Sequence, residues 1–299
     1  MPLAAIAMAG ELRTLGSALP NVNAALLQPL RADLFMDVAL ESTCSLVTAR
    51  AGVDQYRCGS MRRTHRAFVD EAQWAAILRA LQPVHVNIAG GEPGNATSHY
   101  GLFSRWVRLL FAIEARESRV GSRYRWVVRT RPDLIYTCSM SRPLLSHARG
   151  RALLKYDLLA VLPRAAASIA LSMGSRDVNC HCKRQVEQCV PSALHANGHS
   201  FSSALGRIVN VDPFLPSHCY QRRTEDDLCF APRLVAVILR NGTMTSVTGV
   251  ADGRSLPTCS AEYFVPPAAT SLMNFDTRKC RAWPKARRWD FGRWRSGGG

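Results

Sequence analysis

The first 170 residues alternate between short apolar runs and longer amphipathic stretches. The apolar runs predict buried strands at residues 3–9, 33–38, 84–88 and 124–129. Between them, apolar residues recur three and four positions apart, which predicts helices. These helical positions are Val22, Leu26, Leu27 and Leu30, then Trp74, Ile77, Leu78 and Leu81, then Leu102, Trp106, Leu109, Leu110 and Ile113. Strands that alternate with helices predict an α/β fold with a mostly parallel central sheet.

The pattern becomes less regular after Pro143. Residues 157–164 predict a strand and turn, and residues 165–171 predict a helix. Residues 174–230 are rich in predicted loops and carry many of the cysteines, so we expect an irregular, cysteine-containing C-terminal part. Residues 234–240 and 243–247 predict a hairpin, because Asn241-Gly242 between them suits a type I′ turn. We expect one domain over residues 1–275 and a basic tail over residues 276–299.

The composition excludes several classes of protein. Of 299 residues, 47% are hydrophobic and 20% are charged. The chain therefore has enough apolar surface to form a core, which excludes a natively disordered protein. No apolar run reaches the length of about 18 residues that a membrane-spanning helix needs. No GxGxxG motif follows the first strand and no GxxxxGK[ST] loop occurs, which argues against a dinucleotide oxidoreductase and a P-loop NTPase.

The chain is strongly basic. It has 38 basic and 22 acidic residues, a formal net charge of +16. Part of this charge lies in the tail, where residues 276–295 hold eight basic and two acidic residues beside Trp283, Trp289 and Trp294. Such a tail is typical of a solvated terminus, and the alternative is a nucleic-acid or membrane contact. An Arg/Trp tail that binds nucleic acid is therefore one alternative function.

The ten cysteines are dispersed along the chain, which is typical of disulfides in an oxidising compartment. Two glycosylation sequons, at Asn95 and Asn241, agree with a glycoprotein. The first residues read as a strand and not as a signal peptide. We therefore expect the secretory pathway, such as the Golgi lumen, if an anchor precedes this sequence, and the cytoplasm otherwise.

Charged residues and glycines gather where the predicted strands end. Gly10, Glu11 and Arg13 follow the first strand, and a glycine there lets a ligand approach the backbone. The other set is Arg129, Arg131 and Asp133, at the end of the fourth predicted strand. The guanidinium group of an arginine can donate two parallel hydrogen bonds to a diphosphate, and Asp133 offers a carboxylate to a divalent ion. The alternative is a buried Arg–Asp pair that only fixes the strand end.

Three blocks of the chain resemble a diverse group of glycosyltransferase-like proteins of algae, plants, viruses and bacteria. The blocks are AIAMAGELRT (5–14) with ADLF (32–35), YRWVVRTRPDL (124–134) and DLLAVLPR (157–164). They occur in the family's order and span roughly residues 3–172, and the central block is the most specific. The resemblance implies a Rossmann-like fold of the GT-A type, with a nucleotide-binding half near residues 1–140 and an acceptor-side half near 141–275.

The resemblance also implies a reaction and a cofactor. It predicts transfer of a sugar from a nucleotide-sugar donor to an acceptor hydroxyl, with Mn²⁺ or Mg²⁺ held by an Asp-x-Asp motif. This sequence departs from that motif, because it has Arg131-Pro132-Asp133 at the corresponding place. Either Asp133 holds the ion together with the diphosphate, or an arginine replaces the ion in stabilising the leaving group.

A transferase also needs a base for the acceptor hydroxyl. Asp157 and the acidic run that contains Asp226 and Asp227 are the candidates, and the run also reads as a solvated loop. A protein that keeps the fold but binds no donor is a further alternative. Zinc binding is the less favoured interpretation of the segment with Cys180, His181, Cys182, Cys189, His195 and His199, because Cys-x-Cys spacing is unusual for structural zinc.

Overall fold

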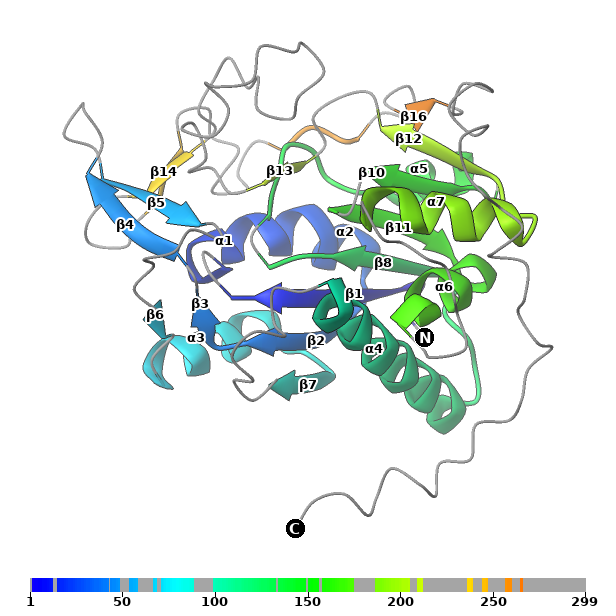
Figure 1. The fold of residues 1–299 in the computed structure, drawn as a ribbon, viewed down its shortest axis with the longest axis horizontal. Helices are drawn as coiled ribbons and strands as arrows, with labels where there is room; N and C mark the ends of the chain where they lie inside the picture. The colour runs from blue at the N-terminus through cyan, green and yellow to red at the C-terminus, as the bar shows by residue number, and fades with distance from the viewer. Residues whose placement is uncertain are drawn as a thin grey trace.

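The computed structural model has an eight-stranded sheet at its centre (Figure 1), with the strand order β16-β12-β10-β11-β8-β1-β2-β7. The structure describes residues 2–12, 15–42, 44–48, 54–58, 67–68, 71–88, 99–132, 134–148, 150–155, 158–174, 186–204, 209–211, 236–238, 244–246, 256–259 and 264–265. The strands of this sheet are β1 (Ala4–Glu11), β2 (Asp33–Ala39), β7 (His85–Ile88), β8 (Trp126–Thr130), β10 (Ala152–Lys155), β11 (Leu159–Pro163), β12 (Phe201–Ala204) and β16 (Phe264–Val265).

Strand directions bring several carboxyl ends to one edge of the sheet. β1 is parallel to both β2 and β8, and β2 is parallel to β7. β11 is antiparallel to β8 and to β10, so β10 runs in the same direction as β8. β12 is parallel to β10, and β16 is antiparallel to β12. The carboxyl ends of β1, β2, β7, β8 and β10 therefore lie at the same edge, which we call the carboxyl edge.

Helices cover both faces of the sheet, so the fold is a three-layer α/β arrangement. On one face, residues of α1 (Leu15–Val22), the π-helical turn η1 (Asn23–Leu27), α2 (Gln28–Leu30), α3 (Glu71–Leu81) and α5 (Arg142–His147) share a core with the sheet. On the other face lie α4 (His99–Val120), α6 (Arg164–Leu171), the short turn η2 (Ser172–Gly174) and α7 (Val186–Ala196). Figure 1 shows α4 in front of the sheet.

The first strand shows how the sequence builds both cores. Its side chains alternate between the two faces. The larger ones, Ile6 and Met8, belong to the core on the α1 face, whereas Ala5, Ala7 and Ala9 belong to the core on the α4 face. The alanines leave room for the bulky α4 residues, which pack in the same core: Phe103, Trp106, Leu109, Leu110 and Ile113. All of β1 up to Ala9 is buried, as expected for a strand covered on both faces.

Two ion-pair clusters tie α4 to its neighbours at its C-terminal end, away from the carboxyl edge. Arg164 donates from Nε and Nη2 to the two carboxylate oxygens of Glu117, each at 2.8 Å. Burial alone lowers the pKa of Arg164, but the charges of Glu117 and Glu114 outweigh it and leave that pKa raised. In the second cluster, Arg116 Nε of α4 lies 3.5 Å from the Asp33 carboxylate at the start of β2. The Tyr124 hydroxyl donates to the same carboxylate at 2.5 Å, and burial together with that bond raises the pKa of Tyr124.

The second half of the chain is more regular than its composition indicates. The prediction of loops over residues 174–230 was wrong for 186–196, which form α7, and for 201–204, which form β12. α7 was missed because Pro191 and its polar residues interrupt the helical pattern, yet Val190 and Leu194 are buried. The predicted hairpin near 234–247 is confirmed, because β14 (Ala236–Ile238) pairs antiparallel with β15 (Met244–Ser246).

Smaller two-stranded sheets lie beside the main sheet. β9 (Leu134–Tyr136) pairs with β13 (Val209–Val211), β3 (Glu41–Ser42) with β6 (Ala67–Phe68), and β4 (Cys44–Thr48) with β5 (Asp54–Cys58). β9 packs on the α1 side of the main sheet, where Leu134, Ile135 and Tyr136 join the core. The chain therefore turns from β8 onto the α1 side within a few residues.

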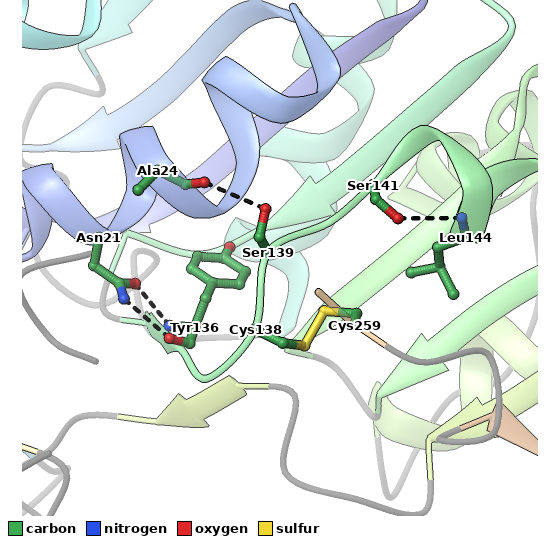
Figure 2. The surroundings of a disulfide bond; sticks show 8 residues. All are labelled: Asn21, Ala24, Tyr136, Cys138, Ser139, Ser141, Leu144 and Cys259. Carbon is green, nitrogen blue, oxygen red and sulfur yellow. Dashed lines mark hydrogen bonds between the residues drawn. A yellow bond between two sulfur atoms is a disulfide. The ribbon is translucent and has the colours of Figure 1, made fainter. Parts of the chain in front are cut away.

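A disulfide joins the segment after β9 to the C-terminal part of the chain. Figure 2 shows the bond between Cys138 and Cys259, which are 121 residues apart in sequence. Beside it, Ser139 N donates to Pro257 O at 2.7 Å and Cys259 N donates to Ser139 O at 2.9 Å. Cys189 is also disulfide-bonded. Within the described residues, no helix is both long and apolar enough to cross a membrane.

Candidate functional site at the carboxyl edge

The candidate site lies where the strand order changes direction. From β1 the chain proceeds outward to β2 and β7, and then returns through α4 to β8 on the other side of β1. In open α/β sheets, ligands bind outside the carboxyl ends of the two strands that flank such a switch point. These two strands are β1, which ends at Gly10 and Glu11, and β8, which is followed by Arg131 and Pro132.

Gly10 and Pro132 are in close contact across this switch point. The backbone of Gly10 has φ +144°, and a Cβ atom added there would lie 3.1 Å from Pro132 Cδ. Both conditions select glycine, because a side chain strains this backbone conformation and must also displace the buried proline ring. The sequence predicts Gly10, Arg13 and the Arg131–Asp133 segment around one site. The structure brings Gly10 and Pro132 of this set into contact, and a donor site there stays a prediction.

We expect Gly10→Ala to lower the free energy of unfolding by about 1–3 kcal/mol, because of backbone strain and the contact with Pro132. Urea unfolding followed by circular dichroism measures the loss. The matched control is Gly16→Ala, on the exposed side of α1, where no atom lies within 4 Å of the added Cβ. That change should stabilise the protein by roughly 0.5–1 kcal/mol. Equal effects of the two substitutions would show that Gly10 is not a special position.

The other predicted donor-site residues fall into three groups. Arg131 is half-buried beside buried Pro132, and Glu11 is half-buried at the end of β1. Arg129 lies instead inside the molecule, 1% exposed, with its guanidinium carbon 4.2 Å from the centroid of the Trp106 ring on α4. This cation–π contact makes Arg129 part of the interface between helix and sheet. Arg13 and Asp133 lie outside the described residues.

The predicted bases also lie outside the described residues. These are Asp157, which falls between the end of β10 and Leu158, and Asp226 and Asp227. The last residue of β10 is Lys155, which is only 7% exposed and stands at the carboxyl edge. The sequons at Asn95 and Asn241 and the tail over 276–299 are likewise outside the described part of the chain.

A buried polar cluster beneath the carboxyl edge was missed in the sequence. Asp37 of β2 is fully buried on the α4 face. Its carboxylate accepts from Arg105 Nη1 at 3.0 Å, from Arg108 Nε at 2.6 Å and Nη2 at 3.2 Å, and from Asn87 Nδ2 at 2.8 Å. Arg105 also donates to the Asp37 carbonyl at 3.3 Å. The cluster therefore ties the N-terminal half of α4 to β2 and β7.

The cluster reaches the end of β1 through Arg105. Burial lowers the pKa of Arg105, and the nearby carboxylates of Asp37 and Glu11 oppose that shift. Arginine nevertheless keeps its charge at neutral pH. On the β7 side, partial burial lowers the pKa of His85 below its ordinary value, while the Asp37 carboxylate again opposes the shift. The charge on Asp37 thus acts on Arg105 of α4 and on His85, the first residue of β7.

A signal for this cluster was present in the sequence. Asp37 is an acid within an otherwise apolar run, LFMDVA, and a buried carboxylate needs partners. Arg105 and Arg108 are three positions apart, so they lie near each other along one side of a helix. What the pattern could not give is that the partners stand on a helix some 70 residues away in the chain.

Thr130 and Tyr136 close the turn that carries Arg131 and Pro132. Thr130 is the last residue of β8 and Tyr136 is the last of β9, and their hydroxyl groups hydrogen-bond to each other within the core. Asn21 of α1 holds Tyr136 in turn (Figure 2), because its Nδ2 donates to Tyr136 O at 2.9 Å and its Oδ1 accepts from Tyr136 N at 2.8 Å. Thr130, Tyr136 and Asn21 are all buried.

No group of three or more histidine, cysteine, aspartate or glutamate residues suited to a metal occurs among the residues that the structure describes. The predicted ligand Asp133 lies outside them, so binding of Mn²⁺ or Mg²⁺ stays a prediction. For zinc, the disulfide at Cys189 removes one candidate thiolate.

Comparison with known proteins gives only a likeness of fold. No protein-family model and no curated protein matches the sequence. Among solved structures, the chain is similar to the mannosyltransferase Ktr4p of S. cerevisiae, with 10% identity and a TM-score of 0.26. The match covers 52% of this chain and 39% of that one, so the chain spans well under half of its length. Likeness at this level concerns the backbone and assigns no substrate.

Proposed function

We propose that this chain is a glycosyltransferase that binds a nucleotide-sugar donor at the carboxyl edge and transfers the sugar to an acceptor hydroxyl. The observation that carries the proposal is the contact between Gly10 and Pro132 at the switch point of the sheet. It supports a donor site because it joins the first and central blocks of the family resemblance at the position where α/β sheets bind ligands. The donor's nucleotide and sugar, and the acceptor, stay open.

Each candidate residue has a chemical task in this proposal. The Arg131 guanidinium binds the donor diphosphate and stabilises the charge that develops on it as the bond to the sugar breaks. Glu11 and the glycine backbone at Gly10 border the same site. Asp157, or Asp226 with Asp227, takes the proton of the acceptor hydroxyl.

A divalent ion would be held by Asp133 together with the donor diphosphate. A single carboxylate fits Mg²⁺ or Mn²⁺ only in this shared form, because such ions otherwise keep several waters. When bound, the ion would neutralise the leaving diphosphate. Since Arg131 precedes Pro132 in the same segment, we expect its charge to act on the diphosphate with or without the ion. The predicted secretory-pathway location and glycosylation belong to the same proposal.

Nucleotide binding tests this proposal directly. We expect at least one of UDP-, GDP- or CMP-sugars to raise the melting temperature of the full chain, measured with and without Mn²⁺. Arg131→Lys should weaken the binding of that nucleotide about tenfold or more, measured by calorimetry, because a point charge does not replace a planar fork. Asp133→Ala should weaken it to a similar degree, and chiefly in the presence of Mn²⁺.

Arg123→Lys is the matched control, because Arg123 is exposed and lies before β8, at its amino end. It should leave binding unchanged. A wild-type chain that responds to none of the donors would overturn the proposal and favour a protein that keeps only the fold. RNA or DNA binding that disappears on truncation before Asp276, without nucleotide-sugar binding, would favour the nucleic-acid alternative.

A further inference from the structure

The turn between β8 and β9 is held by a chain of buried hydrogen bonds on the side of the sheet opposite to α4. Thr130 and Tyr136 bracket residues 131–135, and their hydroxyl groups bond to each other. Asn21 then fixes both the N–H and the carbonyl of Tyr136. Two further contacts hold the chain just after β9, where Met140 N donates to Ala25 O at 2.8 Å and Ser139 Oγ donates to Ala24 O at 3.4 Å.

These contacts attach the turn to one rigid element. The groups that bond the turn and the segment after β9 belong to three residues, Asn21, Ala24 and Ala25. These residues lie in the continuous helical segment formed by α1 and η1. This segment connects β1 to β2 and packs in the same core as β1. β1 and β8 are paired directly, with Met8 opposite Thr130, and this pairing ends two residues before Gly10 and Pro132. Beyond the end of β8, the turn is held by a second link that runs from β1 through α1 to Tyr136, and from Tyr136 to Thr130.

We propose that Tyr136 is a positioning residue for the donor site, and that its hydroxyl fixes the Arg131–Pro132 segment so that Arg131 meets the diphosphate of a nucleotide ligand. The inference rests on the proposed function for the identity of the ligand. The hydroxyl itself is buried in the core and does not contact the ligand. Its effect should therefore concern the diphosphate group and not the base or ribose.

A second buried tyrosine supplies the control. Tyr124 is 1% exposed, and its hydroxyl donates to the Asp33 carboxylate at 2.5 Å and also interacts with Arg116. It precedes β8, whereas Tyr136 acts at the end of β8. Tyr124→Phe and Tyr136→Phe thus each remove one hydroxyl from a well-packed ring, at opposite ends of the same strand. A general loss of stability should be at least as large for Tyr124→Phe, because the Tyr124 hydroxyl bonds a charged group.

The first test needs no ligand. Hydrogen exchange is measured by mass spectrometry on peptides that cover residues 127–137, in the full-length wild type and both variants. We expect Tyr136→Phe to speed exchange in these peptides by about tenfold, the amount that corresponds to loss of one buried hydrogen bond. Tyr124→Phe should leave them unchanged. Unchanged exchange in Tyr136→Phe would overturn the inference whatever the fate of the proposed function.

The second test uses the nucleotide diphosphate that binds wild type and the matching monophosphate. Tyr136→Phe should weaken the diphosphate about tenfold and the monophosphate much less, while Tyr124→Phe alters neither. Thr130→Val should weaken diphosphate binding to the same degree as Tyr136→Phe. Thr130→Ser, which keeps a hydroxyl, should bind the diphosphate as wild type does. Equal weakening of both nucleotides would overturn the positioning role. A wild type that binds neither nucleotide would overturn the ligand assignment, and with it the proposed function.

Discussion

Asp37→Ala is expected to lower the free energy of unfolding by about 3–5 kcal/mol, the usual cost of removing one partner from a buried ion pair. The fully buried carboxylate accepts four side-chain hydrogen bonds, and Arg105 is itself 4% exposed. Without Asp37, the Arg105 guanidinium would stay buried near the like charge of Arg108, with Glu11 as the remaining nearby carboxylate among the described residues. Asn87 would also lose the Asp37 carboxylate as its acceptor. Urea unfolding of the purified chain measures the loss.

The companion variants separate charge from packing. Asp37→Asn keeps the shape but removes the negative charge, so it should also destabilise, because an amide nitrogen then faces two guanidinium groups. Arg108→Ala should cost much less, since the Arg108 side chain is 44% exposed and is solvated when unpaired. Replacing Asp37 by leucine together with Arg105 by methionine should recover much of the stability. Failure of Asp37→Ala to exceed Arg108→Ala would contradict this account.

The sequence predicted the part of the fold that depends on repeated local patterns. Strands and helices up to residue 171 follow from runs such as AIAMA and from apolar residues at helical spacing, and parallel strands place their carboxyl ends together. This is why the pattern predicts Gly10 and the Arg131–Asp133 segment at one edge of the sheet. Two elements were missed for different reasons: β10 has only four residues, and the eleven-residue helix α7 contains Pro191.

The contacts around the candidate site could not be read from the pattern. Arg129 was expected at a diphosphate, yet it packs on Trp106, because its side chain emerges from β8 on the α4 face. Asn21 looks like an ordinary polar helix residue, but it is fully buried and holds the backbone of Tyr136. Such pairings join residues 115 positions apart, and they depend on how the layers pack.

Replacing both Cys138 and Cys259 by serine is expected to lower the free energy of unfolding by about 5 kcal/mol in the chain-entropy model, because the bond closes a loop of more than a hundred residues. The bond also fixes the segment that follows β9, where Ser139 exchanges two backbone hydrogen bonds with residues 257 and 259. Urea unfolding under non-reducing conditions measures the change, and mass spectrometry after thiol alkylation confirms that the bond is present in wild type.

Burial decides how this bond responds to reductant. Cys138 is 2% exposed and Cys259 is 3% exposed. The thiolate of a reductant can therefore attack either sulfur only after the surrounding core has opened. We therefore expect the folded protein to resist dithiothreitol and to lose the bond only once urea populates opened states. Ser139→Ala, which removes only the long bond to Ala24 O, should change stability by less than about 0.5 kcal/mol. A double serine variant as stable as this control would mean that the loop is already constrained by other contacts in the unfolded chain.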